Sequence, residues 1–254
     1  MMMRPADVLS LFDAQMRADP PATAGARIER IGSVVRSGGS WNVVLFWDRD
    51  SRDARAMVAE QAKIVPPNGS PLEWKLYSHD GPEGLATILR DQGFVPDEPE
   101  TLMAFDLELP LPDTAPRDGF EIRGVADVRG VQDFITVSSA AFAEDLSSRA
   151  DTYVRLLGDP THVLYVAYLD GRPVSCGRLQ MPADRAFASM WGGGTVPVHR
   201  RRGIYRALVA FRAHMARQRG YRYITIDARE TSRPILARLG FVPLSGITGW
   251  MLRA

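Results

Sequence analysis

The chain has 254 residues, of which 45% are hydrophobic and 24% charged, and its formal net charge is +1. These proportions are typical of a globular protein with room for one large domain or two modest ones. No run of eighteen apolar residues offers a membrane span. The single cysteine, Cys176, excludes an internal disulfide and a Cys-His metal cluster, and it favours a cytoplasmic location. We therefore expect no membrane and no metal.

The first half of the chain is expected to alternate between helices and strands. In chain order these are a helix over residues 5–18, a strand over 40–47, a helix over 53–64, a strand over 72–79, a helix over 83–92 and a strand over 101–107. Residues 109–119 contain three prolines and a glycine, which disfavour regular structure. We place a linker at residues 113–118, between an N-terminal domain over 1–112 and a C-terminal domain over 119–254.

The second half has clearer local signals. Asp170-Gly171 separates two β-prone runs and predicts a hairpin. Ile204, Leu208 and Met215 recur at helical spacing, and Gly220 ends that helix. The expected elements are a strand over 121–125, helices over 128–142 and 147–157, strands over 163–169, 172–181 and 186–196, a helix from 204, a strand over 221–227, a helix over 231–239 and a strand over 248–252.

The two halves resemble each other. Residues 88–96 match residues 235–243 at an offset of 147, and each match reads as a helix followed by Gly-Phe and a strand. At the same offset Asp80 falls on Asp227 and Trp74 on Tyr221 without a gap. The repeat indicates two copies of one fold.

Charge is distributed unevenly along the chain. Residues 185–226 contain nine arginines and no Asp or Glu, so that this region is either a solvated basic face or the site of an anionic ligand. Within it, residues 196–208 read as the end of a strand, a basic loop with Gly203, and the start of a helix. The first N–H groups of a helix lack intrahelical partners and carry partial positive charge. Together with arginine side chains they predict an anion site suited to a pyrophosphate.

This loop, Arg200-Arg201-Arg202-Gly203-Ile204-Tyr205, resembles the R-x-x-G-x-G/A loop of the GNAT superfamily of N-acetyltransferases. Tyr205 departs from the small residue usual in the family. The helix that follows, Gly220 and the Gly240-Phe241 pair extend the resemblance over residues 119–254. It implies an α+β (mixed α/β) fold, with a mixed, mostly antiparallel sheet flanked by helices in each of two domains. The N-terminal copy lacks the glycine loop after Trp47, so we expect it to be degenerate.

The resemblance implies transfer of an acetyl group from acetyl-CoA to a primary amine of a small molecule or peptide. It also implies a pantetheine arm beside the fourth strand, where three glycines, 192 to 194, would let the arm approach. Val196 and Val198 would offer backbone groups to it. The pyrophosphate would be held by the residues of the loop and first helical turn, namely Arg201, Arg202, Gly203, Ile204, Tyr205 and Arg206.

The pattern offers two candidates for catalytic residues, Ser232 and Glu144. The tyrosine with which many GNAT enzymes protonate the leaving thiolate is replaced by Leu236. Ser232 is a candidate donor to the cofactor or sulfur, the alternative being a turn or cap hydroxyl. Glu144, beside Asp145, follows the first helix of the domain near the expected acceptor cleft, and is either the general base or a solvated cap.

Two other classes of function stay open. A non-catalytic acyl-CoA sensor or scaffold would share the loop and would explain the missing tyrosine. A nucleic-acid-binding protein would use the arginines, but a nucleic-acid site usually spreads over a surface, whereas these arginines lie at one strand-to-helix junction. We therefore expect no nucleic-acid partner, and either a monomer or a homodimer.

Overall fold

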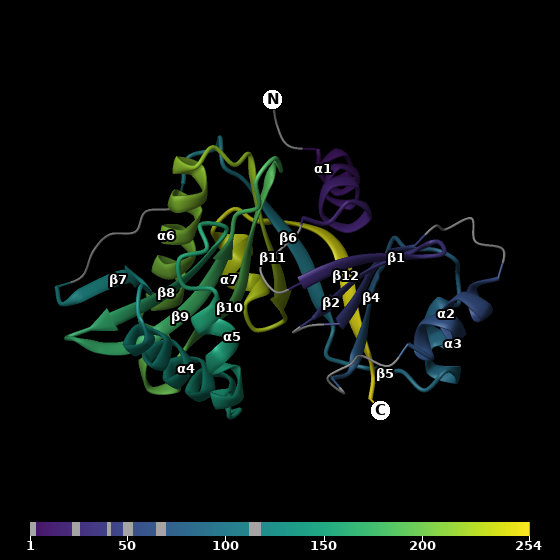
Figure 1. Cartoon of the computed structure of the whole chain (residues 1–254). Coiled ribbons are helices and arrows are strands. Elements are labelled where there is room, and N and C mark those ends of the chain that lie inside the picture. The colour runs from purple at the N-terminus through teal and green to yellow at the C-terminus, as the bar shows by residue number, and fades with distance from the viewer. Residues whose placement is uncertain are drawn as a thin grey trace. The chain divides into compact units, whose positions relative to one another are not determined.

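The structure is a computed structural model that describes residues 4–21, 26–39, 42–47, 53–64, 70–111 and 118–253 (Figure 1). It divides into two compact units. The first comprises Met1–Met103, Asp227–Arg233 and Val242–Ala254, and the second comprises Ala104–Ile226 and Pro234–Phe241. The expected linker lies outside the described residues except for Asp118. The last strand of the chain, within Val242–Ala254, belongs to the first unit. A single boundary along the sequence would instead place this strand with the C-terminal half.

The first unit contains most of the N-terminal half and the C-terminal strand. Its elements are α1 (Pro5–Phe12), the π-helix η1 (Asp13–Ala18), β1 (Ala26–Ile31), β2 (Val34–Gly39), β3 (Asn42–Trp47), α2 (Ala54–Ala62), β4 (Leu72–Tyr77), α3 (Leu85–Asp91), β5 (Val95–Pro96), the start of β6 (Glu100–Asp106) and β12 (Val242–Leu252). The strand order is β1-β2-β3-β4-β12-β6, with β5 on β12. The β3–β4 pair is parallel, and β12 runs antiparallel to β4.

Alternation along β4 builds two different environments in this unit. Leu72 and Trp74 enter an apolar core that α2 and α3 help to form, where the ring centroids of Trp47 and Trp74 are 5.1 Å apart. Successive side chains of a strand point to opposite faces. The intervening residues Glu73 and Lys75 are also buried and form a polar layer instead.

A buried arginine ties the N-terminal helices to the end of β4. Arg17 is 1% exposed and donates to Asp80 at 2.8 Å and to Asp13 at 2.7 Å. Its guanidinium carbon lies 3.9 Å from the ring centre of Tyr77. Asp80 also accepts from the backbone N–H of Tyr77 at 2.9 Å. Asp80 is therefore a structural residue that closes the turn after β4.

The second unit contains the loop that the sequence singled out. Its elements are the end of β6, β7 (Phe120–Gly124), α4 (Val128–Phe142), η2 (Ser147–Arg149), α5 (Ala150–Arg155), β8 (His162–Leu169), β9 (Arg172–Gln180), β10 (Phe187–Thr195), η3 (Pro197–His199), α6 (Ile204–Gln218), the first part of β11 (Tyr223–Arg229) and most of α7 (Arg233–Arg238). The strand order is β6-β11-β10-β9-β8-β7. The β10–β11 pair is parallel, whereas the pairs from β10 to β7 are antiparallel. The expected α+β fold, a mixed and mostly antiparallel sheet flanked by helices, is confirmed.

The sequence repeat corresponds to a repeat in structure. Each copy has a parallel strand pair joined by a helix, β3-α2-β4 in one and β10-α6-β11 in the other. The short helix that follows ends at a glycine with positive φ, 88° at Gly93 and 92° at Gly240. The N–H of Phe94 donates to Leu89 and that of Phe241 to Leu236, both at 3.1 Å. The aromatic ring enters the core each time.

Two features differ from the expected elements. The hairpin of β1 and β2 was not expected, because β1 is largely polar and carries Arg27, Glu29 and Arg30. The last strand was expected to begin at residue 248 but begins at Val242. Gly246 and Gly249 lower the β-propensity of this segment. The strand forms because it pairs with β4, which lies far away in the sequence.

Candidate active site

Strand β10 separates from its parallel neighbour partway along its length. Its pairing with β11 runs from Phe187–Tyr223 to Met190–Ile226 and then stops, although β10 continues to Thr195. Its register with β9 shifts between Trp191 and Gly194. A bulge of this kind bends a strand away from its neighbour. In the described part of the chain, residues 192–195 therefore have no partner on β11, and the edge is open to an added extended chain.

Backbone direction decides which amides face that open edge. The N–H of Val196 donates to the carbonyl of Val174 at 3.0 Å, so it is already used within the protein. Because N–H groups alternate between the two edges of a strand, the amide of Thr195 faces away from β9. Thr195 was not singled out from the sequence, since register is fixed by pairing. Val198 is 74% exposed.

The three glycines of β10 have different roles from those expected. A Cβ at Gly194 would lie 2.7 Å from the Cβ of Ala141, and one at Gly193 would lie 3.2 Å from the ring of Tyr205. These two glycines let α4 and α6 approach the strand. Only Gly192 leaves open space. Gly193 also explains how this chain accepts Tyr205 where a small residue is usual.

The loop between β10 and α6 presents an uncompensated positive surface. Gly203 has a φ of 78° and caps α6, and no side chain caps the first turn of this helix. Arg201, Arg202 and Arg206 are exposed, and no carboxylate of the described residues lies within 4.0 Å of their guanidinium groups. Ile204 is buried against Ala167 and Val174 and anchors the turn. The uncapped start of α6 and the three arginines make this end of the helix electropositive, which suits the anion site that the sequence predicts.

Arg200 has a different role from its neighbours. Its Nε donates to the carbonyl of Thr195 at 3.1 Å and its Nη2 donates to the carbonyl of Ala141 at 2.8 Å. The guanidinium thus fastens the loop to the end of α4. It is a structural residue of the loop, and it brings α4 and the anion site together.

Comparison with known proteins agrees with this geometry. Residues 132–241 match the sequence model of the Acetyltransferase (GNAT) family. Residues 132–241 are a GNAT domain. A chain with this domain is an acyltransferase. No curated protein matches the chain.

Solved GNAT structures resemble the whole chain. A GCN5-related N-acetyltransferase from Kribbella flavida has a TM-score of 0.70 at 18% identity, over 99% of this chain and 96% of that one. A tandem GNAT protein from the clavulanic acid biosynthesis pathway has a TM-score of 0.60 at 15% identity, over 97% and 93%. A GCN5-related N-acetyltransferase from Sphaerobacter thermophilus has a TM-score of 0.59 at 16% identity, over 99% and 94%. At these identities the likeness concerns the fold.

The two catalytic candidates differ in how they are held. Glu144 is exposed just after α4, three residues beyond Ala141, and its side chain has no polar partner among the described residues. Ser232 belongs to the first unit, and its hydroxyl donates to the carbonyl of Arg229 at 3.1 Å. The single proton of that hydroxyl is used in this hydrogen bond, as expected for the alternative in which Ser232 stabilises a turn. Leu236 is fully buried, and its side chain offers no hydroxyl at the position of the tyrosine.

Cys176 is not a nucleophile in this structure. It is fully buried, and burial raises the pKa of its thiol to about 12. A thiol that stays protonated at neutral pH is a weak nucleophile.

Within the described ranges, no group of His, Cys, Asp and Glu side chains is arranged to hold a metal ion. None of the helices there is long and apolar enough to cross a membrane.

A cluster of ionisable side chains in the first unit was missed by the sequence analysis. Lys75 on β4 pairs with Asp227 on β11, and Glu73 and Glu100 complete the cluster. Burial and the charge of Asp227 raise the pKa of Glu100 to about 7. Burial would lower the pKa of Lys75, but the charge of Asp227 outweighs it and raises that pKa. These residues come from three strands far apart in the sequence, so no local pattern joins them.

This cluster predicts a pH-dependent effect of the substitution Glu100→Gln. The folded-state pKa of about 7 lies above the reference value of 4.5, so the folded chain holds more protons between these values. Ionisation of Glu100 therefore destabilises the fold as pH rises through this window. We expect the variant to melt about 2–4 °C above the wild type at pH 8, and at the same temperature near pH 4. A difference in Tm that is equal at both pH values would contradict this.

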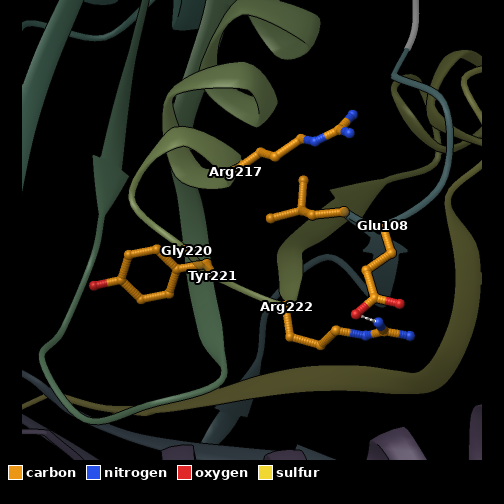
Figure 2. A pocket seen from close by; sticks show the side chains of 6 residues that line it. Glu108, Arg217, Gly220, Tyr221 and Arg222 are labelled. Carbon is orange, nitrogen blue, oxygen red and sulfur yellow. Dashed lines mark ion pairs between the residues drawn. The ribbon is translucent and has the colours of Figure 1, made fainter.

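A pocket at the far end of α6 is not the anion site. It is lined by Leu107, Glu108, Arg217, Gly220, Tyr221 and Arg222. Figure 2 shows Arg222 facing Glu108, with which it forms an ion pair, while Arg217 extends from α6 without touching either. Arg222 also pairs with Asp106 at 2.8 Å. A helix carries partial negative charge at this end, which disfavours an anion.

Proposed function

We propose that this protein transfers an acetyl group from acetyl-CoA to a primary amine of a small molecule or peptide. The observation that carries the proposal is the uncapped start of α6, with Gly203 at positive φ and three exposed arginines that have no carboxylate partner among the described residues. A diphosphate would accept hydrogen bonds from the amides of residues 203–206. Arg201, Arg202 and Arg206 would supply the neutralising charge.

The pantetheine arm would extend from this loop along the open edge of β10. Extended backbone rises about 3.3 Å per residue, so residues 192–195 offer roughly 13 Å of edge. The amide of Thr195 would bond to the arm, while the exposed Val198 would border it. The backbone of Val196 is used within the protein, because its carbonyl accepts from the N–H of His199 at 2.9 Å. The thioester end would then reach the bulge at Gly192, where the strand leaves space.

The reaction requires a neutral amine, a donor for the oxyanion and a stable leaving thiolate. The amine nitrogen attacks the thioester carbon, the C–N bond forms, and the C–S bond breaks with its electron pair on sulfur. A backbone N–H of the β10 bulge would stabilise the oxyanion. Glu144, exposed beyond the end of α4, is our candidate to take the amine proton, directly or through water.

The first unit would be a degenerate second copy of the fold. Its helix α2 stands where α6 stands in the repeat, but the Asp53 carboxylate accepts from the N–H of Ala56 at 2.9 Å. A carboxylate at that helix start competes with a phosphate and repels it. The preceding residues 48–52 lie outside the described residues. We therefore propose one acetyl-CoA site per chain.

Release of free thiol tests the proposal. We expect purified protein mixed with acetyl-CoA and a panel of primary amines, including an amino sugar, a polyamine and a short peptide, to release CoA thiol faster than without amine. Tight acetyl-CoA binding with no release across the panel would favour the sensor function. Binding of oligonucleotides that acetyl-CoA does not displace would favour a nucleic-acid partner.

A further inference from the structure

A buried arginine without a carboxylate partner lies under α6. Arg212 is 0% exposed, and no Asp or Glu of the described residues lies within 4.0 Å of its guanidinium group. Its nearest ionisable neighbours are Tyr205 on the same helix, Tyr165 on β8 and Cys176 on β9. All three are weak acids that are neutral at pH 7. Among the residues that the structure describes, none near the guanidinium group neutralises its charge.

The hydrogen bonding of this guanidinium is incomplete. Nε donates to the carbonyl of Leu208 at 3.3 Å and Nη1 donates to the carbonyl of Arg178 at 3.0 Å. Nη2 is buried and has no acceptor within the described part of the chain. An arginine kept only for packing would be expected to have its donors satisfied, because each buried and unpaired donor destabilises the fold.

Two strands are shaped around this side chain. A Cβ at Gly177 on β9 would lie 2.6 Å from Nη1, and a Cβ at Gly193 on β10 would lie 3.1 Å from Nη2. No other residue type fits at Gly177 without displacing the guanidinium. Gly193 lies within the bulge, one residue past Gly192, where β10 has left β11. The unpaired donor is therefore next to the stretch of β10 that faces the proposed thioester.

A buried cation of this kind is stabilised further when a negative charge comes near it. Removing a guanidinium from water without a partner ion is strongly unfavourable, and the low dielectric that makes this so also strengthens its attraction for an anion. The proposed reaction creates such an anion at β10, because the electron pair of the broken C–S bond stays on sulfur. The chain also lacks the tyrosine at Leu236 that would protonate this sulfur.

We propose that Arg212 is a positioning residue whose charge, acting through the backbone of the β10 bulge, stabilises the CoA thiolate that leaves during acyl transfer. The inference rests on the proposed function. No proton moves to or from the guanidinium: the thiolate leaves as an anion and is protonated later by water. The residue would thus lower the barrier to C–S cleavage without contributing to diphosphate binding.

The pKa of the thiol of bound CoA measures this effect without an acceptor. It is read from thiolate absorbance near 240 nm as pH is raised on the intact protein saturated with CoA. We expect the wild type to hold this pKa about one unit or more below that of Arg212→Met, a tenfold change in thiolate fraction. Arg212→Lys, which keeps the charge, should stay near the wild type. Arg155→Met, at an exposed arginine on α5, is the control and should match the wild type.

Measurements of CoA affinity and kcat separate the proposed role of Arg212 from a role in cofactor binding. CoA affinity should change less than about threefold in every variant, while kcat for thiol release falls about 30-fold in Arg212→Met and is largely kept in Arg212→Lys. If Arg212→Met does not fold, Arg212→Gln replaces it as the uncharged variant. Equal thiol pKa values in wild type and uncharged variants, with CoA bound, would overturn the role of Arg212 alone. Failure of the wild type to bind CoA would instead overturn the proposed function, and the inference with it.

Discussion

Reversal of two loop charges, in the double variant Arg201→Glu and Arg202→Glu, is expected to raise the Kd for acetyl-CoA by at least about 100-fold. Both side chains are exposed and lack carboxylate partners among the described residues, so they are available to a diphosphate. A charge-assisted hydrogen bond is worth about 1.5–3 kcal/mol, and about 1.4 kcal/mol is a factor of ten in affinity. The loss of two such bonds and the added repulsion together raise the Kd by more than about 100-fold. Isothermal titration with acetyl-CoA measures the change.

A matched control separates the effect of reversing charges in the loop from the effect of changing the net charge of the protein. Arg129→Glu with Arg155→Glu changes the total charge equally, at two exposed positions of the same unit on α4 and α5. We expect its Kd to stay within about threefold of the wild type, since exposed charges more than about 10 Å away are screened. Gly203→Val provides a second variant at the loop, because a β-branched residue is strained at a φ of 78°. Unchanged affinity in folded loop variants would refute the placement.

Removal of the Asp80 carboxylate, in Asp80→Ala, is expected to lower the free energy of unfolding by about 3 kcal/mol. Arg17 and Asp80 are both buried and 2.8 Å apart, and breaking a buried ion pair on one side costs about 3–5 kcal/mol. We expect the lower end of that range because Asp13 still pairs with Arg17 at 2.7 Å. Urea unfolding measures the loss.

The exposed ion pair between Arg55 and Asp91 provides the control for Asp80. Both side chains are largely in water, although their charged atoms are 2.7 Å apart. Asp91→Ala should cost less than about 1 kcal/mol, as exposed pairs usually do. Equal decreases in the free energy of unfolding in Asp80→Ala and Asp91→Ala would show that burial does not determine how much the Arg17–Asp80 ion pair stabilises the fold.

Elements with strong local patterns could be predicted from the sequence. Helix α4 occupies residues 128–142 as expected, because its apolar residues recur at helical spacing and the Asp127 carboxylate accepts from the N–H of Gly130 at 2.8 Å. The loop at Gly203 and the hairpin at Asp170-Gly171 depend on neighbouring residues alone. For the same reason the repeat could be recognised, since its Gly-Phe turn is built from bonds within one helix end.

Features set by distant pairing could not be predicted. Nothing in residues 242–254 indicates that β12 belongs beside β4 in the first unit, since that follows from register with residues 72–77. The amide of Thr195 faces the open edge only because Val196 bonds to Val174 on another strand. The cluster of Lys75, Asp227 and Glu100 likewise requires the completed sheet.

The proposed diphosphate site is tested most directly by a crystal structure with CoA bound. We predict diphosphate oxygens about 3 Å from the amides of residues 203–206, guanidinium groups of Arg201 and Arg202 beside them, and the pantetheine arm bonded to the edge of β10 at Thr195. A diphosphate bound elsewhere, with these amides facing only solvent, would contradict the account.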